Sequence, residues 1–272
     1  MSIHSHLVAI TILLATASTL CPSAVPEHLK VRLVSDTDSV QSGRPLLVGL
    51  HFEMDEGWHI YWKNPGDSGE PPRVRWSLPV GFQAAEVQWP APTRLGSGSV
   101  IDYGYEEPVL LPVEIETPEG LAIGSSVTLA ASVSWLVCKD ICVPGKTDVT
   151  LSLPVRTSKG SSSASHQLLQ DARSRVPKPL PPAWTAEATS EMDYFVLTIH
   201  GVGTGNASFF PLESDQIDNA APQRMTPLSD GVRLTLKNSD RLLKPPVVLS
   251  GVLELGSGRA YLVSAAVHAR PR

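Results

Sequence analysis

Residues 127–153 read VTLAASVSWLVCKDICVPGKTDVTLSL, and the rest of the chain is best understood outward from them. Apolar residues occupy every second position from Val127 to Trp135, which predicts a β-strand with one buried face. Residues 148–153 form a second predicted strand beyond a short segment that holds two cysteines. We therefore predict a β-hairpin with Cys138 and Cys142 at its tip. Strand alternation places Cys138 on the face opposite Trp135.

The spacing of the two cysteines is the first functional indication. Three residues separate Cys138 from Cys142, so the two can meet across a tight turn if their Cβ atoms approach disulfide distance. Such a bridge closes a very short loop and removes little entropy from the unfolded chain. A pair that stabilises the fold so little is better suited to thiol exchange than to holding the fold together.

The N-terminus predicts export. Residues 7–14 form an apolar run followed by small residues, so we expect a cleaved secretory signal peptide over residues 1–24. The apolar run is too short to span a bilayer. Cys21 lies in or just after this signal, but the bulky Leu20 before it argues against lipidation. An exported protein meets an oxidising compartment, where a cysteine pair persists as a disulfide.

Composition argues against nucleic-acid binding and favours an all-β architecture. The net charge of −5 argues against nucleic acid as a partner, because nucleic-acid binding needs a basic surface. The 24 prolines and 20 glycines interrupt the chain into short segments, without a long amphipathic helical pattern between them. We therefore predict an all-β protein. A length of 272 residues accommodates two domains of ordinary size.

The predicted domains follow from the strand pattern. The first spans residues 27–156, and its strands are expected at 29–34, 45–52, 74–76, 109–115, 127–135 and 148–153. A polar, proline-rich linker with a short helix at 164–175 is expected over residues 157–183. A second, smaller β domain is expected over residues 184–272, with strands at 194–199, 232–236, 247–255 and 260–263.

Four motifs in the first domain carry a family resemblance. They are GWHIYWKNPGDSG at 57–69, WPAP at 89–92, DYGY at 102–105 and VCKDICVPG at 137–145. Together they resemble the N-terminal periplasmic region of the DsbD/ScsB thiol:disulfide interchange proteins. Segments 209–211 and 220–223 are similar to the second β domain of the ScsB branch. The resemblance implies an immunoglobulin-like β-sandwich in the periplasm, which passes electrons from a membrane domain to thioredoxin-like proteins.

The chain also departs from that family. Its cysteines are closer together than in the best-studied DsbD form, and it contains neither the membrane domain, the thioredoxin-like domain nor a Cys-x-x-Cys pair. We expect either a stand-alone exported protein or the amino part of a longer one. A membrane electron-transfer protein, supplied in trans or by a missing C-terminal half, would then provide electrons.

The resemblance assigns roles to particular residues. Cys142 would attack the partner and Cys138 would resolve the mixed disulfide. His59 and Tyr61 match positions beside the disulfide. Asp102, Tyr103 and Tyr105 match a cap loop whose aromatic ring shields the bridge until a partner docks.

Three functions are compatible with the sequence. The leading prediction is an exported thiol:disulfide interchange protein, a component of a protein-disulfide reductase, that works without a cofactor. The first alternative is Cu(I) handling in copper tolerance, since paired thiolates suit Cu(I). No Met lies near the pair, however, and we predict no metal site. The second alternative is a structural adaptor whose disulfide is inert.

Overall fold

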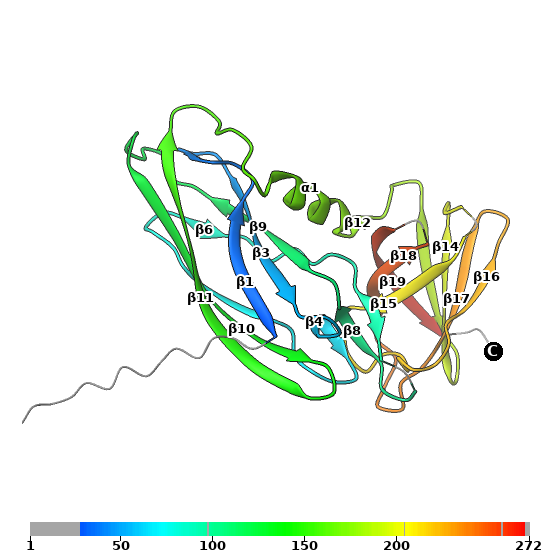
Figure 1. Ribbon diagram of the computed structural model, residues 1–272. Helices are drawn as coiled ribbons and strands as arrows, with labels where there is room; N and C mark the ends of the chain where they lie inside the picture. Colours follow the sequence, from blue (N-terminus) through cyan, green and yellow to red (C-terminus); the bar gives the residue numbers. More distant parts are fainter. Residues whose placement is uncertain (1–27, 97, 204, 257, 270–272) are drawn as a thin grey trace, which may run out of the picture.

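The chain folds into two β domains joined by one helix (Figure 1). The computed structural model describes residues 28–96, 98–203, 205–256 and 258–269. The predicted signal peptide, with Cys21, lies outside these ranges. The all-β prediction is confirmed, and so is the sandwich architecture of the first domain followed by a second β domain.

The first domain is a sandwich of two sheets. The smaller sheet has the order β1-β3-β9-β6 and the larger has the order β2-β11-β10-β4-β8-β7, with β5 paired to β10. The strands of the smaller sheet are β1 (Leu29–Ser35), β3 (Leu46–Met54), β9 (Val109–Glu116) and β6 (Gln83–Ala84). Those of the larger sheet are β2 (Val40–Gln41), β11 (Cys142–Arg156), β10 (Ser126–Cys138), β4 (His59–Gly66), β8 (Asp102–Tyr105), β7 (Thr93–Leu95) and β5 (Arg73–Ser77).

The core between these sheets follows the alternation seen in the sequence. Val127, Leu129, Ala131, Val133 and Trp135 of β10 are all buried in one hydrophobic cluster with residues of β1, β3 and β9. Strands β10 and β11 pair antiparallel in continuous register, ending at Cys138 opposite Cys142. The predicted hairpin is therefore confirmed, and both strands extend beyond the predicted ranges to the cysteines.

Strands β4 and β8 position the site, and the sequence pattern did not predict either as a strand. β4 pairs with β10 at Cys138↔His59 and Val137↔Ile60. It pairs with β8 at Ile60↔Tyr105 and Tyr61↔Gly104, after which the register shifts. These short pairings bring His59 and Tyr61 alongside the end of the hairpin.

The second domain is built on an eight-stranded sheet. Its order is β15-β18-β19-β13-β14-β17-β16, with β12 paired to β19. The strands are β12 (Lys178–Pro179), β13 (Thr185–Ser190), β14 (Tyr194–His200), β15 (Ala207–Pro211), β16 (Arg224–Pro227), β17 (Gly231–Lys237), β18 (Val248–Leu255) and β19 (Arg259–Ala269). Buried apolar residues of β14, β17, β18 and β19 form its separate core.

The segment predicted as a linker is attached to both domains. Its helix α1 (His166–Arg175) buries Leu169 and Ala172 against Leu110 of β9. Farther along, β12 adds to the edge of β19. Within the described ranges, no helix is long and apolar enough to cross a membrane.

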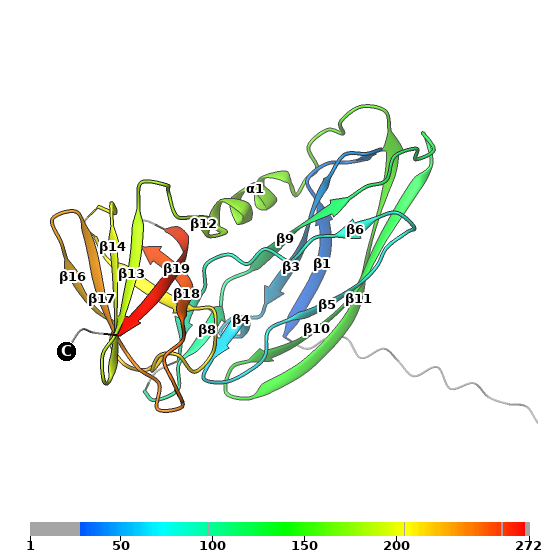
Figure 2. The same ribbon diagram turned by 180° about the vertical axis from the view of Figure 1, so that it is seen from behind.

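The two domains also contact each other directly. Phe210 of β15 and Val252 of β18 belong to the hydrophobic cluster of the first domain. The ring of Phe210 packs edge-on against Tyr103 of β8, with 5.2 Å between centroids. Both views show β4 and β8 lying between β10 and the second domain (Figures 1 and 2). Strands β4 and β8 therefore connect the hairpin tip with the domain interface.

Candidate functional site

The two cysteines form a disulfide at the hairpin tip. The S–S distance between Cys138 and Cys142 is 2.07 Å and their Cα atoms are 4.1 Å apart. Cys138 is almost fully buried, with 2 % of its surface exposed. Cys142 is exposed. Of the two sulfurs, Cys142 is therefore the one that a thiolate in solvent can reach.

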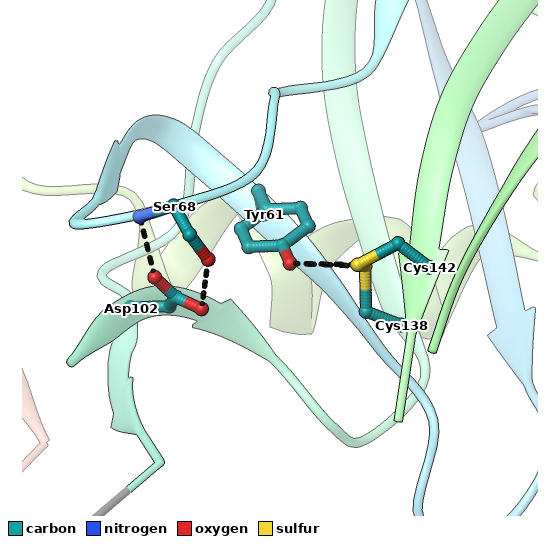
Figure 3. The surroundings of a disulfide bond; sticks show 5 residues. All are labelled: Tyr61, Ser68, Asp102, Cys138 and Cys142. Carbon is teal, nitrogen blue, oxygen red and sulfur yellow. Dashed lines mark hydrogen bonds between the residues drawn. A yellow bond between two sulfur atoms is a disulfide. The ribbon is translucent and has the colours of Figure 1, made fainter. Parts of the chain in front are cut away.

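The phenol of Tyr61 contacts the buried sulfur (Figure 3). Its hydroxyl donates a hydrogen bond to Cys138 Sγ at 3.0 Å and lies 3.7 Å from Cys142 Sγ. Burial, more than the nearby Asp102 carboxylate, raises the pKa of Tyr61, although a hydrogen bond with Ser68 opposes the shift. The phenol is therefore protonated at neutral pH and can donate to a sulfur that gains negative charge.

His59 lies beside this pair, directly across from Cys138 in the β-ladder. Its ring meets the Tyr61 ring edge-on, with 5.2 Å between centroids. Burial lowers the pKa of His59, against the opposing charges of Asp102 and Glu106. The imidazole is thus neutral at pH 7. Its buried Nε2 has no hydrogen-bond partner among the described residues.

Asp102 faces the same side of the sheet as Tyr61. Its carboxylate accepts hydrogen bonds from Ser68 N and Ser68 Oγ, both at 2.8 Å. In Figure 3 the Tyr61 ring lies between this Ser68–Asp102 pair and the disulfide. Of the three predicted cap residues, only Asp102 is on the disulfide face.

The predicted cap formed by Tyr103 and Tyr105 is wrong, because alternation along β8 turns both rings to the other face. Tyr103 is fully buried and its hydroxyl donates to Asn219 Oδ1 at 2.7 Å. The hydroxyl of Tyr105 donates to the carbonyl of Pro90 at 2.7 Å. Burial raises the pKa of both phenols. The two rings belong to the core and shield no sulfur.

A different segment covers Tyr61. We name residues 67–69, between β4 and β5, the Tyr61 loop. Gly69 has a φ of +75°, and a Cβ added there would lie 2.1 Å from Cζ of Tyr61. The loop backbone therefore packs directly on the phenol ring, and only glycine fits that position. The sequence pattern indicated only turns here, so Ser68 and Gly69 were missed as site residues.

Charged and apolar side chains surround the tip. Lys139 Nζ donates to the carbonyl of Glu56 at 3.4 Å. Ile141, next to Cys142, has 67 % of its surface exposed. The described residues contain no group of three or more His, Cys, Asp and Glu side chains able to hold a metal ion.

Comparison with known proteins agrees with the predicted resemblance. Residues 30–154 match the family model described as "Thiol:disulfide interchange protein DsbD, N-terminal". The crystal structure of the N-terminal periplasmic domain of ScsB from Proteus mirabilis shares the fold. The TM-score is 0.64 at 18 % identity, and the match covers 89 % of this chain and 94 % of that chain.

Other matches to solved structures are too weak to support an argument. The tandem Ig repeats of Dlar give a TM-score of 0.24 at 14 % identity, covering 89 % of this chain and 99 % of that chain. A structure of BcpA, the major pilin subunit of Bacillus cereus, gives 0.28 at 8 % identity, covering 88 % and 69 %. No curated protein matches this chain.

Proposed function

We propose, from the premise that residues 30–154 belong to the N-terminal domain family of the thiol:disulfide interchange protein DsbD, that Cys138 and Cys142 exchange disulfides with a partner protein. One observation carries the proposal. The disulfide lies at a hairpin tip with Cys142 exposed and Cys138 buried beneath Tyr61. A structural disulfide needs no exposed sulfur, whereas exchange needs one sulfur within reach of an attacking thiolate.

The exchange balances as two displacements. A partner thiolate attacks Cys142 Sγ, a mixed disulfide forms, and the Cys138–Cys142 bond breaks with Cys138 leaving as a thiolate. The Tyr61 hydroxyl donates to that thiolate. The thiolate of the partner's second cysteine then attacks the sulfur of the partner's first cysteine in the mixed disulfide, and Cys142 leaves as a thiolate. The protein gains a dithiol, and the partner's dithiol is oxidised to a disulfide. The reverse sequence begins with Cys142 attacking the partner.

The proposed partner is a thioredoxin-like protein of the periplasm, with a membrane electron-transfer protein on the other side of the exchange. Family membership supports this class of partner, and the predicted signal peptide supports export. The exposed Ile141 beside Cys142 offers apolar surface for a docking protein. The net charge of −5 argues against a nucleic-acid partner.

The first prediction is a reversible disulfide. Mass spectrometry of the air-oxidised mature protein should find Cys138 bonded to Cys142, and equilibration with glutathione or dithiothreitol should open it. We expect a reduction potential between about −270 and −120 mV, the range of known oxidoreductases. Free thiols under air would contradict the disulfide itself, and a potential below about −300 mV would identify an inert structural bond.

The second prediction concerns the two sulfurs. In Cys138→Ser, the exposed Cys142 should trap a thioredoxin-like partner as a mixed disulfide, because Cys138 is no longer present to resolve that disulfide and complete the transfer. In Cys142→Ser, the buried Cys138 should trap little. Non-reducing electrophoresis after mixing with an oxidised partner measures both. Equal trapping by the two variants, or trapping through Cys138 alone, would refute the assignment of roles.

A further inference from the structure

The outer side of the Tyr61 loop contacts the second domain. Asp67 Oδ2 accepts a hydrogen bond from the backbone N–H of Ile101 at 2.8 Å. Asp67 Oδ1 accepts another from Asn219 Nδ2, also at 2.8 Å. The carboxylate of Asp67 is therefore held by the start of β8 on one side and by the second domain on the other.

Asn219 is buried at this interface, with 6 % of its surface exposed. Both polar atoms of its amide go to the first domain, since Oδ1 accepts the hydroxyl hydrogen of Tyr103. The guanidinium of Arg94 donates to its backbone carbonyl. A buried amide with both ends bonded is fixed in place, because each unpaired end would carry a desolvation penalty.

A second contact fixes the strand that leads into the loop. Asn64 of β4 is 3 % exposed, and its Nδ2 donates to the carbonyl of Pro211 at 2.8 Å. Its Oδ1 accepts hydrogen bonds from Ser214 Oγ at 3.1 Å and from Gly66 N at 3.2 Å. Residues 211–219 of the second domain thus hold both ends of the short stretch 64–67.

A continuous chain of contacts connects the domain interface with Cys138 Sγ. Asp67, Ser68 and Gly69 are consecutive, Ser68 is bonded to Asp102, and Gly69 packs on the Tyr61 ring. The Tyr61 hydroxyl then reaches Cys138 Sγ. Displacing Asp67 therefore displaces the surface that orients the phenol.

We propose that Asn219 is a positioning residue for the redox site: by holding Asp67 it fixes the Tyr61 loop, and so keeps the Tyr61 hydroxyl on the departing sulfur of Cys138. This inference deepens the proposed function and rests on it. The second domain is then part of the exchange machinery, although it holds no cysteine.

The test is the rate at which dithiothreitol reduces the disulfide of the full-length protein. One dithiothreitol thiolate attacks Cys142 and Cys138 leaves as a thiolate. The second dithiothreitol thiolate then releases Cys142 and forms the cyclic disulfide. Asn219→Ala should slow this reaction about three- to tenfold, because a poorly oriented phenol stabilises the leaving thiolate less. In the reduced protein, the thiol pKa of Cys138 should rise.

Two further variants separate positioning from general destabilisation. Asn219→Asp keeps the size of the side chain and the acceptor for Tyr103 but removes the donor to Asp67, so it should slow reduction at least as much. Gln223→Ala is the matched control. It removes an amide that bonds the backbone N–H and carbonyl of Phe209 inside the second domain, and it should leave the rate unchanged.

Combination with Tyr61→Phe gives the decisive result. If Asn219 acts through the phenol hydroxyl, adding Asn219→Ala to Tyr61→Phe should cause no further slowing. An unchanged rate in Asn219→Ala, a faster rate, or additive slowing in the double variant would each overturn the proposal. Dithiothreitol needs no protein partner, so failure here leaves exchange with a partner intact, and failure to trap a partner leaves this result intact.

Discussion

Replacing Tyr103 with alanine is expected to lower the free energy of unfolding by about 3–5 kcal/mol, as for other large buried aromatic side chains. The ring is fully buried between β8 and the second domain, and it packs edge-on against Phe210. Its removal leaves a cavity where the two domains meet and takes the donor from Asn219 Oδ1. Urea denaturation followed by tryptophan fluorescence measures the loss.

Tyr103→Phe is the matched variant. It keeps the ring and removes only the hydroxyl, so the expected loss is about 1–3 kcal/mol from an unsatisfied buried acceptor. A loss below about 1 kcal/mol in Tyr103→Ala would place the ring in a mobile surface loop and restore the cap hypothesis. In that case the alanine variant would also react faster with dithiothreitol.

Replacing Tyr61 with phenylalanine should slow reduction of the disulfide by dithiothreitol about tenfold or more. The hydrogen bond from the phenol to Cys138 Sγ strengthens as that sulfur acquires charge, so it stabilises the transition state more than the ground state. Hydrogen bonds to charged groups contribute about 1.5–3 kcal/mol, and about 1.4 kcal/mol corresponds to a tenfold change in rate. The ring itself remains to pack against Gly69, so the fold should be retained.

The pH dependence gives a second measurement on the same variant. Losing a donor disfavours the charged form of Cys138, so its thiol pKa should be higher in Tyr61→Phe than in the wild type. The ultraviolet absorbance of the thiolate, followed against pH in the reduced protein, reports this shift. Tyr105→Phe is the control, since it removes a hydroxyl from the opposite face of the sheet. If dithiothreitol reduces Tyr61→Phe at the wild-type rate, the phenol hydroxyl takes no part in the reaction.

The strands with clear apolar patterns could be predicted from the sequence. Buried alternation identified β10, and the cysteine spacing identified the hairpin tip. β4 could not be found this way, because Asn64, Pro65 and Gly66 normally indicate a turn. Asn64 is stable inside a strand only because Pro211 and Ser214, about 150 positions away, satisfy its amide. That information is absent from any local window of sequence.

The candidate site could be predicted only in part, again because the sequence does not show tertiary contacts. The cysteines followed from their spacing, and His59 and Tyr61 from the family resemblance; the structure places all four together. The cap failed because motif position says nothing about which face a side chain occupies. The register Tyr61↔Gly104 decides that Asp102 and Gly104 share the disulfide face, while Tyr103 and Tyr105 do not. Asn219 had no signal in the sequence, since its partner Asp67 is revealed only by tertiary structure.

The contact between Asp67 and Asn219 has a consequence for the order of events during synthesis. The two residues are 152 positions apart, and a chain lengthens at about 5–20 residues per second. Roughly 8–30 s therefore pass between the appearance of Asp67 and that of the side chain that holds it. Cys138 and Cys142 emerge within that interval. The first domain can thus fold before the residue that holds Asp67 has been made. Under our proposal, the phenol beside the two cysteines is oriented only when the second domain has folded.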